Sequence, residues 1–165
     1  MAKADLTAQR LREVLHYDPE TGLFTALYSS SWDRQAGQPV GCLSMPNGYV
    51  LIWLDRRSYR AHRLAWLYMT GEWPTDVIDH INGVKHDNRF VNLRDVPREV
   101  NMQNIRRANR NSSHGVLGAY AKGSRWVAAI TVKGKTLTIG SFATIDEAHA
   151  AYLAAKRKHH PGCLI

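Results

Sequence analysis

A basic and polar stretch at residues 106–113 divides the sequence and most limits the folds open to the chain. It contains no large apolar residue, and its composition is typical of a helix end that continues into a linker. The 165 residues are enough for one ordinary domain or two small ones. We therefore expect one domain in residues 1–110 and a second in residues 111–165.

The two predicted domains differ in charge. The chain has 22 Lys and Arg against 14 Asp and Glu, a formal net charge of +8. Residues 111–165 contribute +5 of this charge, because they hold 7 basic and 2 acidic residues. A sequence pI near 9.8 favours a polyanionic partner, with nucleic acid first.

Composition also excludes several classes of protein. Hydrophobic residues make up 44% and charged residues 22%, as in a folded globular protein. No apolar run approaches the roughly 18 residues of a membrane span, and the first residues do not resemble a signal peptide. The two cysteines, Cys42 and Cys163, are too few for a disulfide scaffold or a four-ligand zinc site. We expect a cytoplasmic protein with no membrane partner and no structural zinc.

Apolar spacing and turn residues predict a mixed α+β fold in the first domain. Pro46-Asn47-Gly48 is a strong hairpin signal, and Gly71 is a helix stop. The predicted helices cover about residues 6–15 and 62–70, and the predicted strands about residues 23–28, 41–44, 49–54 and 58–61.

A polar segment follows, with a different organisation. Two short strands, near residues 77–81 and 93–96, flank a long loop, and a helix is expected from about Pro97 because Pro favours a first helical turn. That helix would carry Asn101 and Asn104. The sequence thus predicts a β-loop-β-α unit over about residues 76–106.

The second domain has a simpler pattern. Residues 113–121, 125–132 and 135–142 predict three antiparallel strands, separated by turns that contain Gly123 and Gly134. Thr144 and Glu147 predict a capping box at the start of a final helix. We expect a small three-stranded antiparallel sheet packed on one helix.

The pair Asp79-His80 is the strongest candidate for chemistry. In a strand, neighbouring side chains point to opposite faces, so one can hold a metal while the other acts beside it. The imidazole of His80 titrates near neutrality and suits a general base for phosphodiester hydrolysis. Asp79 is a hard oxygen ligand for Mg²⁺, Asn101 offers a neutral oxygen, and Asn92 is suited to orient the imidazole.

These residues form a recognisable set. The runs 79–83 (Asp-His-Ile-Asn-Gly), 87–89 (Asp-Asn-Arg) and 92–94 (Asn-Leu-Arg), followed by Asn101, resemble the signature of HNH endonucleases, in the H-N-N variant of the phage and intron-homing branch. The preceding residues 59–66 also resemble this branch, and the likeness covers about residues 5–110.

The resemblance implies a ββα-metal unit that cuts DNA with one divalent cation. His80 would activate the attacking water, Asp79 and Asn101 would bind the metal, and Asn92 would orient the histidine. Many relatives have His where this chain has Asn101, so Mg²⁺ or Mn²⁺ is expected rather than tightly held Zn²⁺. Asn104, one turn on, is the alternative ligand. The products would carry a 5′-phosphate and a 3′-hydroxyl.

The second domain resembles another family. Residues 126–130 (Trp-Val-Ala-Ala-Ile), 140–144 (Gly-Ser-Phe-Ala-Thr), Glu147-Ala148 and Ala151-Tyr152 are similar to the Apetala/ethylene-response-factor (ERF) DNA-binding domain. In that family a three-stranded sheet enters the DNA major groove. Few arginines occupy the corresponding face here, which favours contacts to phosphates over the reading of bases.

Several further residues have predicted supporting roles. Asn88 is expected to brace the loop, and His62 is either a structural residue or a contact in the active site. The Arg residues near 106–110 are either a solvated helix face or phosphate contacts. The residues predicted to contact DNA are Arg63, Arg89, Arg94, Arg106, Arg107, Arg110, Tyr120, Lys122, Arg125, Lys133 and Lys135.

The sequence therefore predicts a metal-dependent HNH endonuclease that acts on double-stranded DNA, by nicking or by double-strand cleavage. The alternative is a non-catalytic DNA-binding regulator on a degenerate HNH scaffold. An RNA-directed or structural protein is the third possibility.

Overall fold

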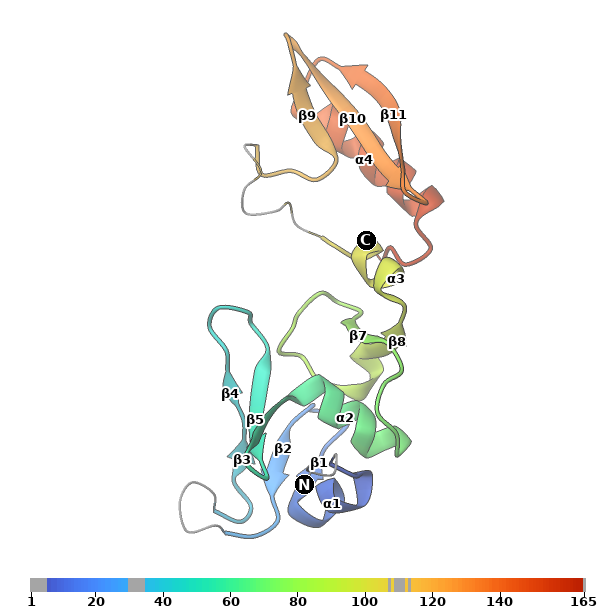
Figure 1. The fold of residues 1–165 in the computed structure, drawn as a ribbon. Coiled ribbons are helices and arrows are strands. Elements are labelled where there is room, and N and C mark those ends of the chain that lie inside the picture. Colours follow the sequence, from blue (N-terminus) through green and yellow to red (C-terminus); the bar gives the residue numbers. More distant parts are fainter. Residues whose placement is uncertain (1–5, 30–34, 107, 109–111, 113, 165) are drawn as a thin grey trace. The chain divides into compact units, whose positions relative to one another are not determined.

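The computed structural model describes residues 6–29, 35–106, 108, 112 and 114–164 (Figure 1). Contacts divide the chain into two compact units, residues 1–97 and residues 98–165. The predicted domain boundary near residue 110 stays a prediction. Among the described residues, no helix combines the length and the apolar character needed to cross a membrane.

The first unit contains two helices, one 3₁₀ turn and three small antiparallel sheets. The sheets have the strand orders β1-β2-β3, β4-β5-β6 and β7-β8. The elements in chain order are α1 (Ala8–Val14), β1 (Leu15–Tyr17), β2 (Phe24–Ala26), β3 (Pro39–Val40), β4 (Cys42–Leu43), β5 (Val50–Leu54), β6 (Arg57–Arg60), α2 (Ala61–Thr70), β7 (Val77–His80), η1 (Phe90–Asn92) and β8 (Leu93–Val96).

The core of this unit lies between the two helices and the strands that flank them. Leu11 of α1 and Leu64 of α2 are fully buried, since their apolar faces pack together. The rings of Tyr17 and Phe24 lie 4.7 Å apart in the same core. This core supports the loops that carry the predicted chemistry.

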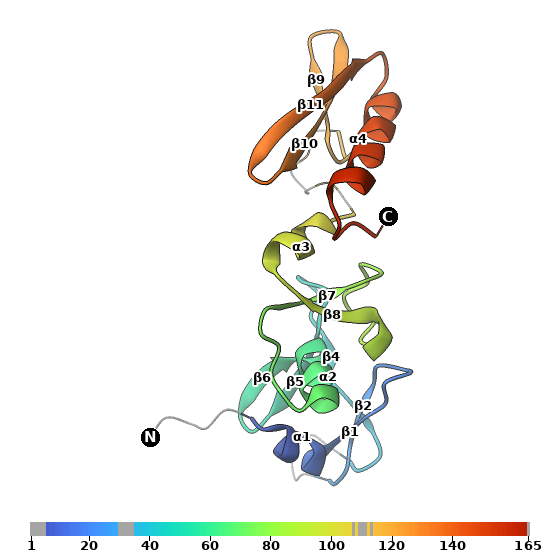
Figure 2. The ribbon, with the colours of Figure 1, turned by 90° about the vertical axis from the view of Figure 1, so that its right-hand side faces the viewer.

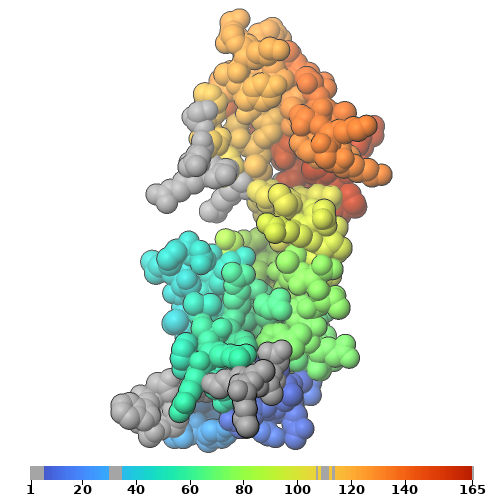
Figure 3. Space-filling model, viewed as in Figure 1, coloured from blue at the N-terminus to red at the C-terminus, as the bar shows by residue number. Residues whose placement is uncertain are grey.

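The second unit has the predicted sheet and helix. After the short helix α3 (Arg98–Gln103) come β9 (Ala119–Lys122), β10 (Arg125–Val132), β11 (Lys135–Phe142) and α4 (Ile145–His159). The three strands are antiparallel with β10 central, and α4 covers one face (Figure 2). Thr144 and Glu147 form the predicted capping box. Figure 3 views the sheet from the side opposite α4.

The short helix α3 is held by the end of the chain. Lys156 is buried on α4 and donates to the carbonyl oxygen of Ile105, just after α3. The backbone nitrogen of Gly162 donates to Oε1 of Gln103 at 2.9 Å, and Arg106 donates to the carbonyl oxygen of Leu164. These contacts explain why α3 groups with the C-terminal unit.

The structure confirms the predicted mixed α+β class with small antiparallel sheets. Strands β1 and β3 were not predicted, and several boundaries differ from the prediction, two of them for a clear physical reason. Helix α1 ends at Val14, because Leu15 takes an extended conformation and pairs with Ala26 of β2. Strand β9 begins at Ala119 rather than near residue 113, because Gly115 and Gly118 both have φ near +69°, which a strand does not accommodate.

Candidate active site

The catalytic candidates lie where β7 ends. Asp79 and His80 are its last two residues and both are buried, with side chains on opposite faces of the strand. Asp79 pairs across the ribbon with Arg94 of β8, whose Nε and a terminal guanidinium nitrogen donate to Oδ2 at 2.9 and 2.7 Å. The predicted metal ligand and a predicted DNA contact are therefore joined in one ion pair.

The imidazole of His80 lies among other rings and one amide. The ring centroids of His80 and His62 are 5.0 Å apart and nearly perpendicular, and Tyr49 lies 6.0 Å from His80. Oδ1 of Asn88 lies 3.4 Å from Nε2 of His80. If the amide oxygen accepts at Nε2, the proton of neutral His80 is on Nε2 and Nδ1 is the basic nitrogen. This tautomer suits a general base.

Burial affects both histidines. It lowers the pKa of His80 below its ordinary value, and the nearby Lys85 acts in the same direction. Burial is the main cause that lowers the pKa of His62, to about 3, and the neighbours His80, Arg60 and Arg63 act in the same direction. His62 is thus neutral near pH 7, and its buried Nδ1 has no hydrogen-bond partner within the described part of the chain.

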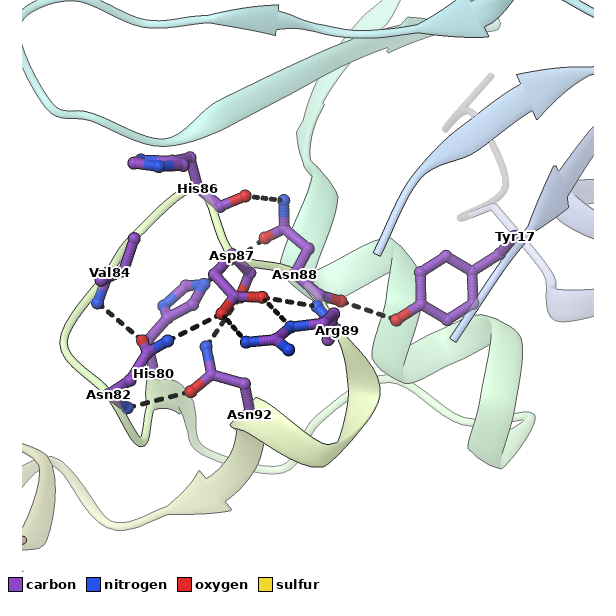
Figure 4. Close-up of polar contacts among 9 residues, drawn as sticks. All are labelled: Tyr17, His80, Asn82, Val84, His86, Asp87, Asn88, Arg89 and Asn92. Atoms are coloured by element: carbon purple, nitrogen blue, oxygen red, sulfur yellow. Dashed lines mark hydrogen bonds and ion pairs between the residues drawn. The ribbon is translucent and has the colours of Figure 1, made fainter. Parts of the chain in front are cut away.

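The loop between β7 and β8 is held by its own side chains (Figure 4). Oδ1 of Asn92 accepts from the backbone nitrogen of Asn82 at 2.9 Å, and its Nδ2 donates to the carbonyl oxygen of Asp87 at 2.8 Å. The side chain of Asp87 accepts from Asn82 and pairs with Arg89. These partners, Arg89 first, lower the pKa of Asp87 to about 2. The loop is thus held by hydrogen bonds and an ion pair among its own residues.

The side-chain amides of Asn88 and Asn92 in this loop have different contacts. The sequence predicts that Asn92 orients His80. The hydrogen bonds described for the Asn92 amide instead join it to the backbone of Asn82 and Asp87 in the same loop. The amide next to the imidazole is that of Asn88, which is buried and also donates to the carbonyl oxygen of His86. The orienting role of Asn92 stays a prediction, and Asn88 is an additional candidate for it.

The same loop is anchored to the core of the first unit. The hydroxyl of Tyr17 donates to the carbonyl oxygen of Asn88 at 2.6 Å. The backbone nitrogen of Phe90 donates to the carbonyl oxygen of Pro19 at 3.0 Å. A Cβ on Gly22 would lie 2.5 Å from the backbone nitrogen of Arg89. The turn at residues 18–22 thus packs directly against the catalytic loop.

The other predicted DNA contacts are distributed over both units. In the first unit, Arg63 lies over the ring of Trp73 and Arg89 is paired with Asp87. In the second, strand pairing places Lys122, Arg125 and Tyr120 on the sheet face opposite α4. The remaining residues are Lys133 in the β10–β11 turn, Lys135 at the start of β11, Arg106 after α3, and Arg107 and Arg110, which lie outside the described residues.

The predicted metal ligands are one carboxylate, Asp79, and one of two amides, Asn101 or Asn104. No group of three or more His, Cys, Asp or Glu suitable for a metal is found among the described residues. A hard cation such as Mg²⁺ needs fewer protein ligands, because it keeps several waters and binds substrate phosphates. Asp79 offers a carboxylate, while Asn101 on α3 and the buried Asn104 belong to the second unit. Their role as metal ligands stays a prediction.

The shifted pKa of His62 predicts a pH-dependent stability. Histidine in an unfolded chain titrates near pH 6.5, and His62 in the folded protein titrates at about 3. Between these values the unfolded state binds the extra proton, so stability is complete above about pH 6.5 and falls as the pH decreases. His62→Gln is expected to reduce this slope in urea unfolding between about pH 4 and 7. The exposed His86, changed to Gln, is the control; equal slopes in all three proteins would contradict the expectation.

Comparison with known proteins adds one finding. Residues 59–103 match the family model of HNH endonucleases, from Tyr59 on β6 to Gln103 at the end of α3. No curated protein and no solved structure matches the chain. The match covers less than half of the chain and includes His62, Asp79, His80, Asn92 and Asn101. It supports an HNH nuclease, a family that acts on DNA and generally uses a divalent metal.

Proposed function

We propose that the chain is a metal-dependent HNH endonuclease that hydrolyses phosphodiester bonds in double-stranded DNA. The observation that carries this proposal is the arrangement at the end of β7. His80 is buried beside the amide of Asn88, Asp79 lies on the other face of the same strand, and the adjoining loop is fixed by its own hydrogen bonds. Such pre-organisation is what a general base and a metal ligand need.

In this proposal His80 takes the proton of the attacking water through Nδ1, and Asn88 holds its ring from Nε2. Asn92 keeps the loop closed. Asp79 and Asn101, with Asn104 as the alternative, would hold one Mg²⁺ or Mn²⁺, since carboxylate and amide oxygens suit a hard cation. When bound, the cation supplies positive charge to the oxygens of the scissile phosphate.

The second unit is proposed to add affinity for DNA. Its sheet and covering helix have the element order of the ERF-like domain that the sequence resembles. Arg125 is positioned on the open sheet face by hydrogen bonds to the Oγ and carbonyl oxygen of Ser141. Cations on this face suit phosphate contacts, which are independent of base sequence.

One observation favours the alternative of a DNA-binding regulator without catalysis. The carboxylate of Asp79 is bonded to Arg94, and this contact competes with metal binding. A regulator would bind DNA through the same basic surfaces and leave it intact.

A plasmid assay separates the two functions. Supercoiled DNA incubated with the full chain and Mg²⁺ or Mn²⁺ is expected to become open-circular or linear, and EDTA is expected to stop the reaction. The products should carry 5′-phosphates, which a ligase can reseal. Binding of the plasmid with no cleavage in either metal would support the regulator instead.

A further inference from the structure

The ring of Tyr49 gathers two positive side chains beside the candidate active site. Tyr49 directly precedes β5, at the end of the β4–β5 hairpin loop. The guanidinium of Arg60, from the end of β6, lies 4.8 Å from the centre of this ring. Nζ of Lys85, from the catalytic loop, lies 5.0 Å from it and also donates to the carbonyl oxygen of Asn47 at 3.2 Å. Two separate segments therefore bring cations to one ring.

These two charges have no carboxylate partner among the described residues. Other arginines of this unit do form ion pairs, for example Arg10 with Asp55, Arg89 with Asp87 and Arg94 with Asp79. Neither Arg60 nor Lys85 forms an ion pair with a carboxylate in the described parts of the chain, and both side chains are exposed. Each is ordered by cation–π contact with a half-buried ring, which holds a charge in place without neutralising it.

The cluster adjoins the predicted general base. The ring of Tyr49 lies 5.1 Å from that of His62 and 6.0 Å from that of His80. The charge of Lys85 contributes to the lowered pKa of His80, and that of Arg60 to the lowered pKa of His62, as expected for neighbours. A substrate whose scissile bond reaches His80 would therefore have adjoining backbone next to this ring.

We propose that Arg60 and Lys85, held over Tyr49, form a site for one backbone phosphate of the DNA strand that is cut. The proposal rests on the proposed nuclease function and names a substrate contact that it does not contain. Arginine offers a fork of donors to phosphate oxygens and lysine a point charge, so the two together suit a phosphate. Because the cations lie over the ring, Tyr49 serves as their support rather than as a surface for base stacking.

The test measures DNA binding without catalysis. The full chain is titrated with a fluorescent 20-base-pair duplex in EDTA at several salt concentrations, and the slope of log K against log salt is determined. Each phosphate contact contributes about 0.9 to the size of this slope for duplex DNA. The double variant R60Q/K85Q is expected to reduce the slope by about one unit, the value for one phosphate.

A matched control lies on the same sheet. Arg56 is exposed in the β5–β6 turn, at the other end of β5 from Tyr49, about 20 Å along the strand by its rise per residue. R56Q removes one charge from the same hairpin and should leave the slope unchanged. Y49F retains the ring and should match the unchanged protein, whereas Y49L should weaken binding, because the two cations lose their support.

The outcomes are distinguishable from those of the nuclease assay. An unchanged slope in R60Q/K85Q, or an equal decrease in R56Q, would overturn the phosphate site even if the protein cuts DNA. A decrease confined to R60Q/K85Q would support the site even if no cleavage is found, and only the nuclease function would then fail. Binding by Y49L equal to that of Y49F would also count against the proposal, because the ring would then have no part in it.

Discussion

The variant His80→Ala is expected to cut DNA about 10²–10⁴-fold more slowly than the unchanged protein, while binding duplex DNA nearly as tightly. This is the range that removal of a positioned general base typically costs. His80 is buried, and the exposed cations that would contact phosphates belong to other residues. The rate is measured on plasmid DNA under single-turnover conditions with Mg²⁺, and binding is measured on a short duplex in EDTA.

Two variants control for the loss of the ring. His86→Ala removes an exposed imidazole from the same loop but keeps the backbone carbonyl that Asn88 contacts, so cleavage should be unchanged. His80→Gln retains a side chain between His62 and Asn88 without a base of suitable pKa, and it should remain inactive. If His80→Ala lost binding and cleavage equally, the imidazole would act in DNA binding or in folding and not on the attacking water.

Much of the local structure follows from short-range signals. Gly71 ends α2 in a left-handed conformation, as its position in the sequence predicts, and Thr144 and Glu147 cap α4. Both signals depend on residues within one or two helical turns. Strand β8 has the predicted bounds, and β7 ends at His80, one residue before its predicted end.

The contacts that complete the candidate site join distant segments, and the sequence alone does not predict them. Tyr49 and Lys85 are 36 positions apart, and Tyr17 reaches the carbonyl oxygen of Asn88 across 71 positions. The choice between Asn88 and Asn92 as the partner of His80 is equally a matter of loop conformation. Both are asparagines with the same donors and acceptors, so residue type does not distinguish them.

Helix α3 shows a further limit of sequence patterns. The family match and the predicted β-loop-β-α unit both extend through α3, yet its contacts with Lys156 and Gly162 group it with the C-terminal unit. A linear motif ends where its residue pattern ends, whereas packing is decided by which surfaces are apolar or can form hydrogen bonds. The helix that carries Asn101 is therefore dependent on a segment that lies 50 or more residues later in the chain.

Gly118→Ala is expected to destabilise the second unit strongly. Gly118 has φ of +69°, and a Cβ there would lie only 1.9 Å from Cδ2 of Tyr152, a buried residue of the core formed by the sheet and α4. The backbone strain costs about 1 kcal/mol and overpacking of a core about 3 kcal/mol more. Amide hydrogen exchange, measured by mass spectrometry on peptides from β9 to β11, reports this loss for the second unit separately from the first.

Gly115→Ala provides the matched control. Gly115 has the same φ of +69°, but a Cβ there would meet no atom within 4 Å. It should lose only the strain, about 1 kcal/mol, so the difference between the two variants isolates the contact with Tyr152. Equal protection in both would show that Gly118 is required only for its backbone conformation.

If the sheet supplies DNA affinity as proposed, Gly118→Ala should also raise the Kd for duplex DNA, while Gly115→Ala should leave it near that of the unchanged protein. A Kd that is unaffected by loss of the folded sheet would place DNA binding in the first unit alone.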